Sequence, residues 1–130
     1  MTSTSAPTNV TDLNRQWGEA FNAGDLSRLM EFYEPDAVLV PGPDAEPVRG
    51  PEAIEASLRW FLALGGRIRF TPRHWLVHGD LALGSITFTL DGGHDADGNP
   101  VELHGTTSEL VRRQPDGTWK YVIDHPFGGA

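Results

Sequence analysis

An acidic side chain and an imidazole stand next to each other near the end of the chain, in "WKYVIDHPFGGA" (residues 119–130). Asp124 and His125 follow a β-branched and aromatic run at residues 121–123, which predicts a strand that Pro126 ends. Carboxylates and imidazoles are common proton-transfer groups in enzymes. Because neighbouring side chains of a strand point to opposite faces, we expect only one member of this pair to face the interior.

The segments before this strand predict three helices. The first carries one apolar stripe at helical spacing and ends at Gly24, a residue suited to a left-handed C-cap. The stripe consists of Val10, Leu13, Trp17, Ala20 and Phe21. Asp25 is expected to cap a short second helix, which residues 35–36 end. Pro51 starts the third helix, over residues 52–64.

The rest of the chain predicts strands, at residues 37–40, 67–78, 81–90, 101–114 and 119–125. Turn residues join the last four strands as antiparallel hairpins. The predicted class is therefore α+β, with the helices packed on one face of a curved sheet. The length fits a single domain over residues 8–130, after a Ser/Thr/Pro-rich tail at residues 1–7 that we expect to be disordered.

Composition excludes several classes of function. The net charge of −8 argues against nucleic acid and anionic membranes as partners. The absence of cysteine removes disulfides, thiolate catalysis and cysteine-based metal sites. No apolar run reaches the roughly 20 residues of a membrane span. The first ten residues lack the basic and apolar regions of a secretory signal, so we expect a cytoplasmic location.

Polar side chains in "DGGHDADGNP" (residues 91–100) invite a calcium interpretation, which their spacing does not support. An EF-hand loop needs a D-x-[DN]-x-[DN]-G pattern with a glutamate at its twelfth position. Here Gly98 follows Asp97 directly and Pro100 breaks the register, so a solvated hairpin tip is expected. The five histidines have no helical metal-ligand spacing, and the chain has no dinucleotide fingerprint or P-loop. We therefore expect neither a metal nor a cofactor.

Three segments, "FNAGDLSRLMEFYEPDAVLV", "VRGPEAI" and "DGTWKYVIDHPFG", resemble the nuclear transport factor 2-like superfamily. Within it, the chain is most similar to small bacterial SnoaL-like and YybH-type proteins. The resemblance implies a cone-shaped α+β barrel, in which a strongly curved, mostly antiparallel sheet wraps around three helices and encloses a mostly apolar pocket. It also implies a homodimer formed through the outer face of the sheet. Relatives include ketosteroid isomerases, cyclases, dehydratases, hydrolases and proteins that only bind, so the fold does not fix the function.

The ketosteroid isomerase pattern fails on this chain. That pattern requires an aspartate base together with a tyrosine and a protonated aspartate. Aligned through Asn22-Ala23-Gly24-Asp25-Leu26, it places Trp17 at the tyrosine position, Val40 or Pro41 at the base and Ser108 at the second acid. A steroid-type isomerase using that triad is therefore not expected.

The same alignment to the ketosteroid isomerase pattern predicts which strand residues face the pocket. In the strand at 101–114 these are His104, Thr106, Ser108, Leu110 and Arg112, whereas Leu103, Thr107, Glu109 and Val111 would face outward. In the last strand, Val122, Asp124 and Pro126 would face the pocket, and Tyr121, Ile123 and His125 would face away.

Asp124 and His104 are therefore the predicted catalytic residues. In some SnoaL-like cyclases an aspartate of the last strand is the base, and Asp124 resembles that placement. An apolar pocket raises the pKa of an aspartate and makes it a general base near neutral pH. His104 or Ser108 would donate a hydrogen bond to it. The predicted substrate-binding wall consists of Trp17, Phe21, Tyr33, Val40, Trp60, Phe61, Phe88, Thr106, Ser108, Leu110 and Val122.

Two functions remain open at this point. One is a cofactor-independent enzyme on a small hydrophobic or polyketide-like molecule, catalysing a cyclisation, isomerisation, dehydration or hydrolysis. The other is a protein of the same fold that binds a small ligand, or serves as an accessory subunit, without turnover.

Overall fold

A computed structural model describes residues 7–129. A short 3-10 turn and two helices come first, two strands and a third helix follow, and five further strands come after them in succession. In chain order the elements are η1 (Val10–Asp12), α1 (Leu13–Asn22), α2 (Leu26–Met30), β1 (Tyr33–Leu39), β2 (Val48–Arg49), α3 (Pro51–Ala63), β3 (Arg67–His78), β4 (Leu81–His94), β5 (Pro100–Thr106), β6 (Ser108–Arg113) and β7 (Trp119–His125).

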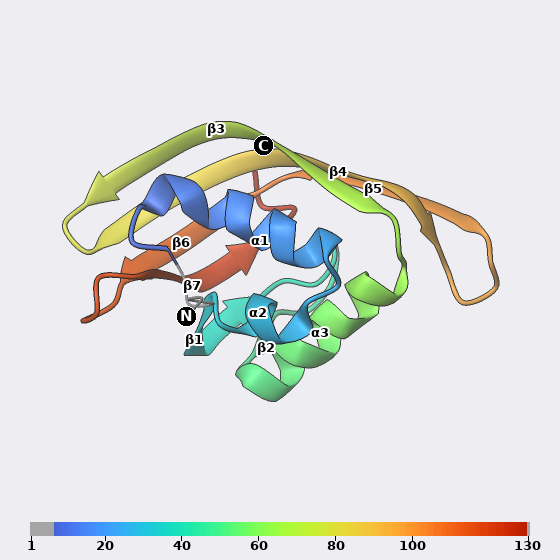
Figure 1. The fold of residues 1–130 in the computed structure, drawn as a ribbon, viewed down its shortest axis with the longest axis horizontal. Helices are drawn as coiled ribbons and strands as arrows, with labels where there is room; N and C mark the ends of the chain where they lie inside the picture. Colours follow the sequence, from blue (N-terminus) through green and yellow to red (C-terminus); the bar gives the residue numbers. More distant parts are fainter. Residues whose placement is uncertain (1–6, 130) are drawn as a thin grey trace.

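The strands form one curved, mostly antiparallel sheet with the helices on its inner side (Figure 1). The strand order is β2-β1-β7-β6-β4-β3, and β5 pairs with the second half of β4. Only the β1–β7 pair is parallel among the described strands. The predicted α+β class and three helices are confirmed, but the sheet is open, with β2 and β3 at its edges, rather than a closed barrel.

Helix α1 is fixed to the sheet at its C-terminal end. Asn22 Nδ2 donates to the carbonyl oxygen of Ile68 at 3.0 Å, and the Ile68 N–H donates back to Asn22 Oδ1 at 2.8 Å. A glycine allows close packing in the middle of the helix, because a Cβ at Gly18 would lie 2.8 Å from the Phe70 ring. The pocket-facing side of α1 is therefore held against β3.

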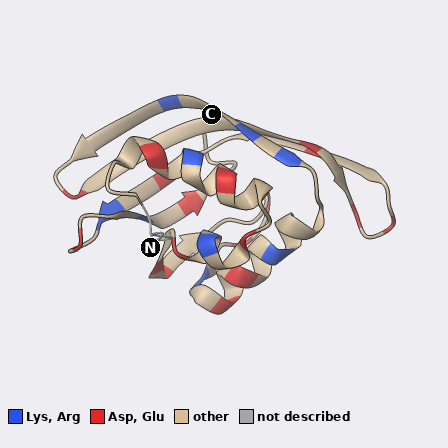
Figure 2. Ribbon diagram, in the orientation of Figure 1, with Lys and Arg blue, Asp and Glu red and all other residues tan. Residues whose placement is uncertain are grey.

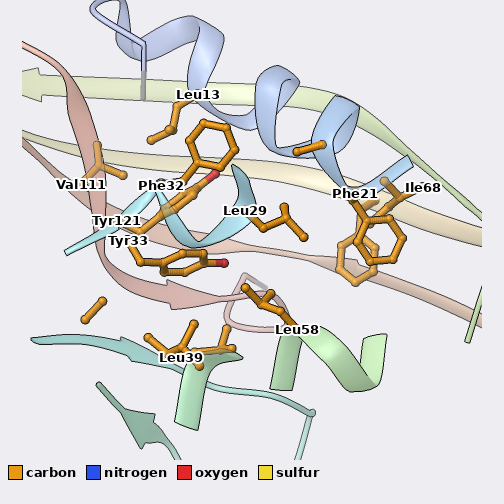
Figure 3. Packing of buried hydrophobic residues seen from close by; sticks show 14 of the residues in the cluster. Leu13, Phe21, Leu29, Phe32, Tyr33, Leu39, Leu58, Ile68, Val111 and Tyr121 are labelled. Carbon is orange, nitrogen blue, oxygen red and sulfur yellow. The ribbon is translucent and has the colours of Figure 1, made fainter. Parts of the chain in front are cut away.

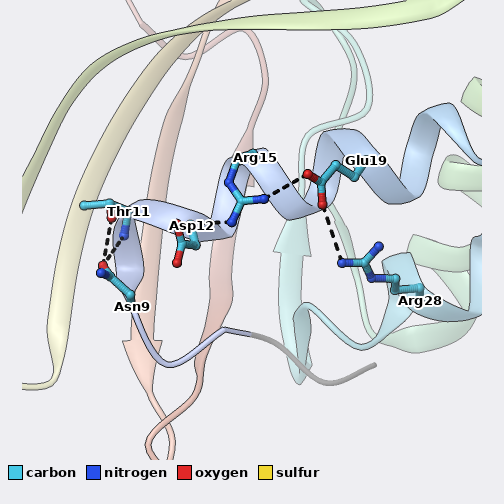
Figure 4. Close-up of polar contacts among 6 residues, drawn as sticks. All are labelled: Asn9, Thr11, Asp12, Arg15, Glu19 and Arg28. Carbon is cyan, nitrogen blue, oxygen red and sulfur yellow. Dashed lines mark hydrogen bonds and ion pairs between the residues drawn. The ribbon is translucent and has the colours of Figure 1, made fainter. Parts of the chain in front are cut away.

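The outer surface of α1 is linked to α2 by charged side chains (Figure 4). Arg15 contacts Asp12 at 3.2 Å and Glu19 at 2.8 Å, and Arg28 lies 3.9 Å from Glu19. Exposed pairs of this kind each add well under about 1 kcal/mol. Helix α2 is stabilised at its start by Asp25. The Asp25 side chain accepts the N–H of Arg28, which confirms the predicted N-cap.

Three predicted strands have other bounds in the structure. The strand predicted over residues 81–90 continues to His94 as β4, so the first four residues of the predicted hairpin connection belong to a strand. Strand β1 begins at Tyr33, so residues 35–36 lie within a strand instead of ending a helix; its pairing with β7 is irregular there, which tolerates the proline. The strand predicted over residues 101–114 is two strands, β5 and β6. They separate at Thr107, whose N–H donates to the Ile86 carbonyl and whose Oγ1 accepts the Ile86 N–H.

The predicted tail at residues 1–7 falls largely outside the described residues, which begin at Pro7. Pro7 itself is buried, and its carbonyl oxygen accepts the N–H of Trp119. Pro7 is thus held against the start of β7. None of the helices in residues 7–129 is long and apolar enough to cross a membrane.

Aromatic and aliphatic side chains fill the space between helices and sheet (Figure 3). The largest fully buried side chains include Phe32, Leu13, Leu58 and Val111. Acidic and basic residues are interspersed along the helices and at strand ends (Figure 2). The interior of the curved sheet is thus apolar, which makes each polar side chain that reaches it unusual.

Candidate active site

A pocket lies between the helices and the inner face of the sheet, with mostly apolar walls. Helix α1 contributes Asn14, Trp17 and Phe21, and α3 contributes Leu58 and Phe61. The other lining residues come from the strands and the segments that follow them: Leu39, Ile68, Phe70, Ile86, Phe88, Leu90, Leu103, Thr107, Glu109, Tyr121, Asp124 and Pro126.

Asp124 is a carboxylic acid in this apolar wall, with 8% of its surface exposed. Tyr33 Oη donates to Asp124 Oδ2 at 2.7 Å, and Trp17 Nε1 donates to Tyr33 Oη at 3.0 Å. Burial raises the pKa of Asp124 to about 6, and the Tyr33 hydrogen bond opposes that rise. At neutral pH the group is therefore mostly an ionised, poorly solvated carboxylate, the state a general base requires.

A β-bulge brings two residues of β7 to the same face. Val111 pairs with Tyr121, whereas Leu110 pairs with Ile123, so Val122 is the extra residue of β7. Tyr121 and Asp124 consequently both line the pocket, although they lie three positions apart. The prediction that Tyr121 faces away is wrong for this reason, and Val122 does not line the pocket.

Glu109 of β6 is a second buried acid, with 2% of its surface exposed, and it pairs directly with Asp124 across the sheet. Burial, followed by the Asp124 charge, raises the pKa of Glu109 to about 8. Asn14 lies close by and accepts the Tyr121 hydroxyl at 2.5 Å through Oδ1. Weak hydrogen bonds with Thr107 and Asn14 oppose the rise in the pKa of Glu109, although Asn14 Nδ2 and Glu109 Oε2 have no partner at full hydrogen-bond geometry among the described residues.

The side chains in the strand predicted over residues 101–114 point to the faces opposite to those predicted. Thr107, Glu109 and Val111 are buried, and Leu103 lines the pocket, whereas His104 is exposed on the other face. On that face Thr106, Ser108 and Leu110 are half-buried and Arg112 is exposed. A shift of one position reverses every side chain of a strand. His104 therefore does not reach Asp124, and Ser108 Oγ instead donates to the Gly128 carbonyl at 3.4 Å.

Some of the other residues predicted to line the pocket do so, and three do not. Trp17, Phe21, Phe61 and Phe88 line the pocket. Tyr33 acts from behind the wall, through its bond to Asp124. Val40 is buried outside the pocket, where its N–H donates to the Asp124 carbonyl oxygen. Trp60 is 56% exposed, because it precedes Phe61 by one position and so lies about 100° around the helix.

Sequence reasoning missed Glu109, Asn14, Thr107 and Tyr121. One signal for Glu109 was available: Val101, Leu103 and Val111 place the apolar residues of this segment at odd positions, together with residue 109. Asn14 follows Leu13 on the buried side of α1 and precedes Trp17 by three positions, which also places it near the apolar stripe.

In the acidic hairpin between β4 and β5, a side chain of the hairpin forms hydrogen bonds with the hairpin's own backbone. Asp95 Oδ1 accepts the N–H groups of Asp97 and Asn99, each at 2.9 Å, and these residues are exposed. Asp95 is thereby used as a turn former. Within residues 7–129 no three His, Asp or Glu side chains gather in a geometry suited to a metal ion.

Replacement of Tyr33 by phenylalanine should alter both stability and the ionisation of Asp124. It leaves Asp124 Oδ2 and Trp17 Nε1 without a partner, at a cost of about 1–3 kcal/mol in free energy of unfolding. Because the Tyr33 bond lowers the pKa of Asp124, that pKa should rise in the variant. Tyr121→Phe is the matched control. Equal effects of both variants on the Asp124 titration would contradict the assignment.

The chain was compared with known families and structures. The model of the SnoaL-like domain matches residues 14–122. A conserved protein from Planctomyces limnophilus has a TM-score of 0.78 at 19% identity, over 91% of each chain. A ketosteroid isomerase-like protein from Erwinia carotovora atroseptica has a TM-score of 0.73 at 20% identity, over 84% of this chain and 85% of its own.

A nuclear transport factor 2-like protein of unknown function from Shewanella oneidensis is similar at a TM-score of 0.72 and 20% identity, over 89% of this chain and 93% of its own. No curated protein sequence is significantly similar to the chain. Identities at this level support a common fold and leave the chemistry to be argued from the site.

Proposed function

Because the chain belongs to the SnoaL-like domain family of the nuclear transport factor 2-like superfamily, we propose that it is a cofactor-independent enzyme acting on a small hydrophobic molecule, with Asp124 as general base. The observation that carries this proposal is the environment of Asp124, a buried carboxylate in a mostly apolar wall. A carboxylate with a pKa of about 6 is ionised at neutral pH and is a stronger base than a solvated one.

Tyr33 is the positioning residue in this proposal. Its hydroxyl binds one oxygen of Asp124 and is itself held by the Trp17 indole, so the position of that carboxylate oxygen is restrained. A fixed base that faces a bound ligand needs little rearrangement before proton transfer. Removal of a proton from carbon, followed by its return at another position or by loss of a leaving group, covers isomerase-, cyclase- and lyase-type reactions.

The charge of the wall favours uncharged ligands. The pocket-lining residues include two acids, Glu109 and Asp124, and none is Lys, Arg or His. An anionic ligand would enter next to the Asp124 carboxylate without a compensating cation, which is unfavourable in an apolar environment. The aromatic and aliphatic walls favour an apolar body.

A general carbon acid tests the base without knowledge of the natural substrate. In 5-nitro-1,2-benzisoxazole, a base removes the C3 proton while the N–O bond breaks, which gives a nitrile and a coloured phenolate. We expect the protein to accelerate this ring opening well beyond an equal concentration of acetate in the same buffer, because Asp124 is poorly solvated. A rate equal to that of acetate would contradict the proposed catalysis and favour a protein that only binds its ligand.

We also propose that two copies of the chain pair through the outer face of the sheet. One aliphatic residue from each of five neighbouring strands lies in register there: Val38, Ile123, Leu110, Leu83 and Leu76. Leu76 is 62% exposed, Leu83 46% and Ile123 40%. Val38 and Leu110 are half-buried. A continuous apolar row of this kind on an outer face is typical of an interface, and across a two-fold axis it meets its own copy.

Replacement of Leu83 by glutamate should separate the copies, because it places a charge within this row. Light scattering coupled to size exclusion should give the mass of a dimer for the unmodified protein and about half that mass for the variant. Ala56→Glu, on the exposed surface of α3, is the control and should stay dimeric. A monomeric unmodified protein would overturn the proposed pairing.

A further inference from the structure

Four polar residues form a row across the outer face of the sheet: His74 of β3, Ser85 of β4, Ser108 of β6 and His125 of β7. His74 pairs with Ser85, and Ser108 pairs with His125. Ser85 and Ser108 lie opposite each other when the register of β4 and β6 is continued by one position. Two positions along each of these strands, the next residue on this face belongs to the apolar row through which two copies are proposed to pair. The polar row and the apolar row therefore lie side by side.

An arginine is fixed on the polar row. Arg73 is the extra residue of a bulge in β3, and its Nη1 donates to Ser85 Oγ at 2.8 Å. Ser85 Oγ in turn donates to the Thr107 carbonyl oxygen at 2.7 Å, and Ser85 is 4% exposed. The ion pairs within residues 7–129 do not include Arg73. The row thus carries a positive charge next to His74 that no carboxylate compensates.

The imidazoles of His74 and His125 have uncharged neighbours across the sheet. Strand β3 is an edge strand, so Ser85 is the cross-strand neighbour of His74. His125 has Ser108 on one side and Val40, which follows β1, on the other. His74 is exposed and His125 is half-buried, so a second copy that covers this face also covers both imidazoles.

The carboxylates nearest to these strands point elsewhere or are already bound. Glu109 and Asp124 point to the pocket, on the opposite face of the sheet. On the other side of the apolar row, Glu34 is bound by Arg112 at 2.9 Å. Neither pair of acids is therefore available to an imidazole of the polar row.

The other charged or titratable residues beside the apolar row are His78, Asp80, Lys120 and Asp36. Asp80 is bound by Arg113 at 2.6 Å. Asp36 forms no ion pair within residues 7–129, but it lies on β1, four strands away from His74. A second copy on this face therefore brings mainly cations, hydroxyl groups and apolar side chains to the imidazoles.

We propose that the polar row makes the pairing of two copies depend on pH, with the copies together at pH 8 and apart in mild acid. This inference rests on the proposed pairing through the outer face. The partner can cover an uncharged imidazole at little cost, whereas a protonated imidazole beside Arg73 is buried without a carboxylate. A histidine ordinarily takes up its proton near pH 6.5. Protons therefore bind the separate copies more strongly than the pair, and the dissociation constant rises as the pH falls through this range.

The overall charge of the chain acts in the opposite direction. The net charge is −8 at pH 7 and the pI is about 4.9, so repulsion between two copies weakens as the pH falls. Overall charge alone predicts tighter pairing in mild acid, whereas the polar row predicts weaker pairing. The direction of the change distinguishes the two effects.

Sedimentation equilibrium at pH 8 and pH 5.5 measures the dissociation constant of the pair. We expect a constant at least about tenfold larger at pH 5.5, because four imidazoles of the pair then carry charge. Circular dichroism at both pH values should show a folded chain. A constant that is unchanged or smaller at pH 5.5 would retain the proposed pairing and overturn its dependence on pH. A monomer already at pH 8 would reject both.

Variants locate the effect at the two imidazoles. A protein with both His74→Gln and His125→Gln should pair at pH 5.5 as strongly as at pH 8, because glutamine is uncharged at both. His104→Gln is the matched control: His104 is exposed on the same face, but its partner Thr89 lies beyond Ser85 along β4, farther from the apolar row. This control should keep the full response to pH. If the double variant keeps it as well, the polar row is not its origin and the proposal is wrong.

Discussion

Replacement of Asp124 by asparagine is expected to lower the rate of benzisoxazole ring opening by about 10²–10⁴-fold, the range typical of a lost general base. Asparagine has nearly the same shape, and its carbonyl oxygen can still accept the Tyr33 hydroxyl, so the pocket should remain folded. The affinity of the pocket for isopropylbenzene, an uncharged apolar probe, should therefore change little. The measurement is the difference in kcat/KM between the two proteins, with thermal unfolding as a check on structure.

The pH dependence of this rate has a defined sign. The base acts only after it has lost its proton, so the rate of the unmodified protein should rise as the pH increases through about 6 and then level off. The Asp124→Asn protein should lack this inflection. Asp36→Asn, at an exposed position of β1, is the matched control and should behave like the unmodified protein. Loss of activity in the control, or its retention in Asp124→Asn, would contradict the assignment.

Replacement of Glu109 by glutamine is expected to stabilise the protein, most strongly at high pH. Glu109 has an ordinary pKa of 4.5 and a pKa of about 8 in the folded chain. Between these values the folded state holds a proton that the unfolded state has released, so stability falls as the pH rises through this window. Above pH 8 the ionised Glu109 lowers the free energy of unfolding by on the order of 3–5 kcal/mol in full. Glutamine is uncharged at every pH and avoids it.

Thermal unfolding at pH 5 and pH 9 measures this effect. At pH 9 the Tm of Glu109→Gln should exceed that of the unmodified protein by about 10 °C, and at pH 5 the difference should be small. Glu102→Gln, at an exposed position of β5, provides the control and should show no such pH-dependent gain. A gain that is the same at both pH values would indicate better packing instead of a removed charge.

Local signals in the sequence predicted much of the fold. Asp25 caps a helix as expected, and the strands at residues 67–78 and 119–125 have the predicted bounds. These features depend on neighbouring residues alone, namely capping, alternation and turns. Strand β2 and the parallel β1–β7 pair were not predicted, because they are set by contacts between distant segments.

The site was harder to predict than the fold. Asp124 was selected because strand alternation separates it from His125 and the family resemblance turns the acid toward the pocket, and it does line the pocket. Its neighbour Glu109 was assigned to the wrong face, because the register was taken from a distant resemblance instead of from the apolar odd positions of the segment. The bulge at Val122, which places Tyr121 and Asp124 on one face, has no signal in the sequence.

The Tyr33 bond to Asp124 also arises only in the folded chain, since the two residues are 91 positions apart. His104 illustrates the opposite case. Its side chain type suggests proton transfer, yet its strand position exposes it to solvent. Residue type selects candidates, whereas the face of the strand decides which of them meet.

Titration of the Asp124 carboxyl carbon tests the central claim most directly. In protein labelled with carbon-13 at aspartate side chains, the Asp124 resonance is identified by its loss in Asp124→Asn, and its shift is followed from pH 3 to pH 9. We predict a midpoint at about 6, raised by burial in the apolar wall. A midpoint near the ordinary value of 3.8 would mean that water solvates the carboxylate, and it would contradict the assignment of Asp124 as a poorly solvated base.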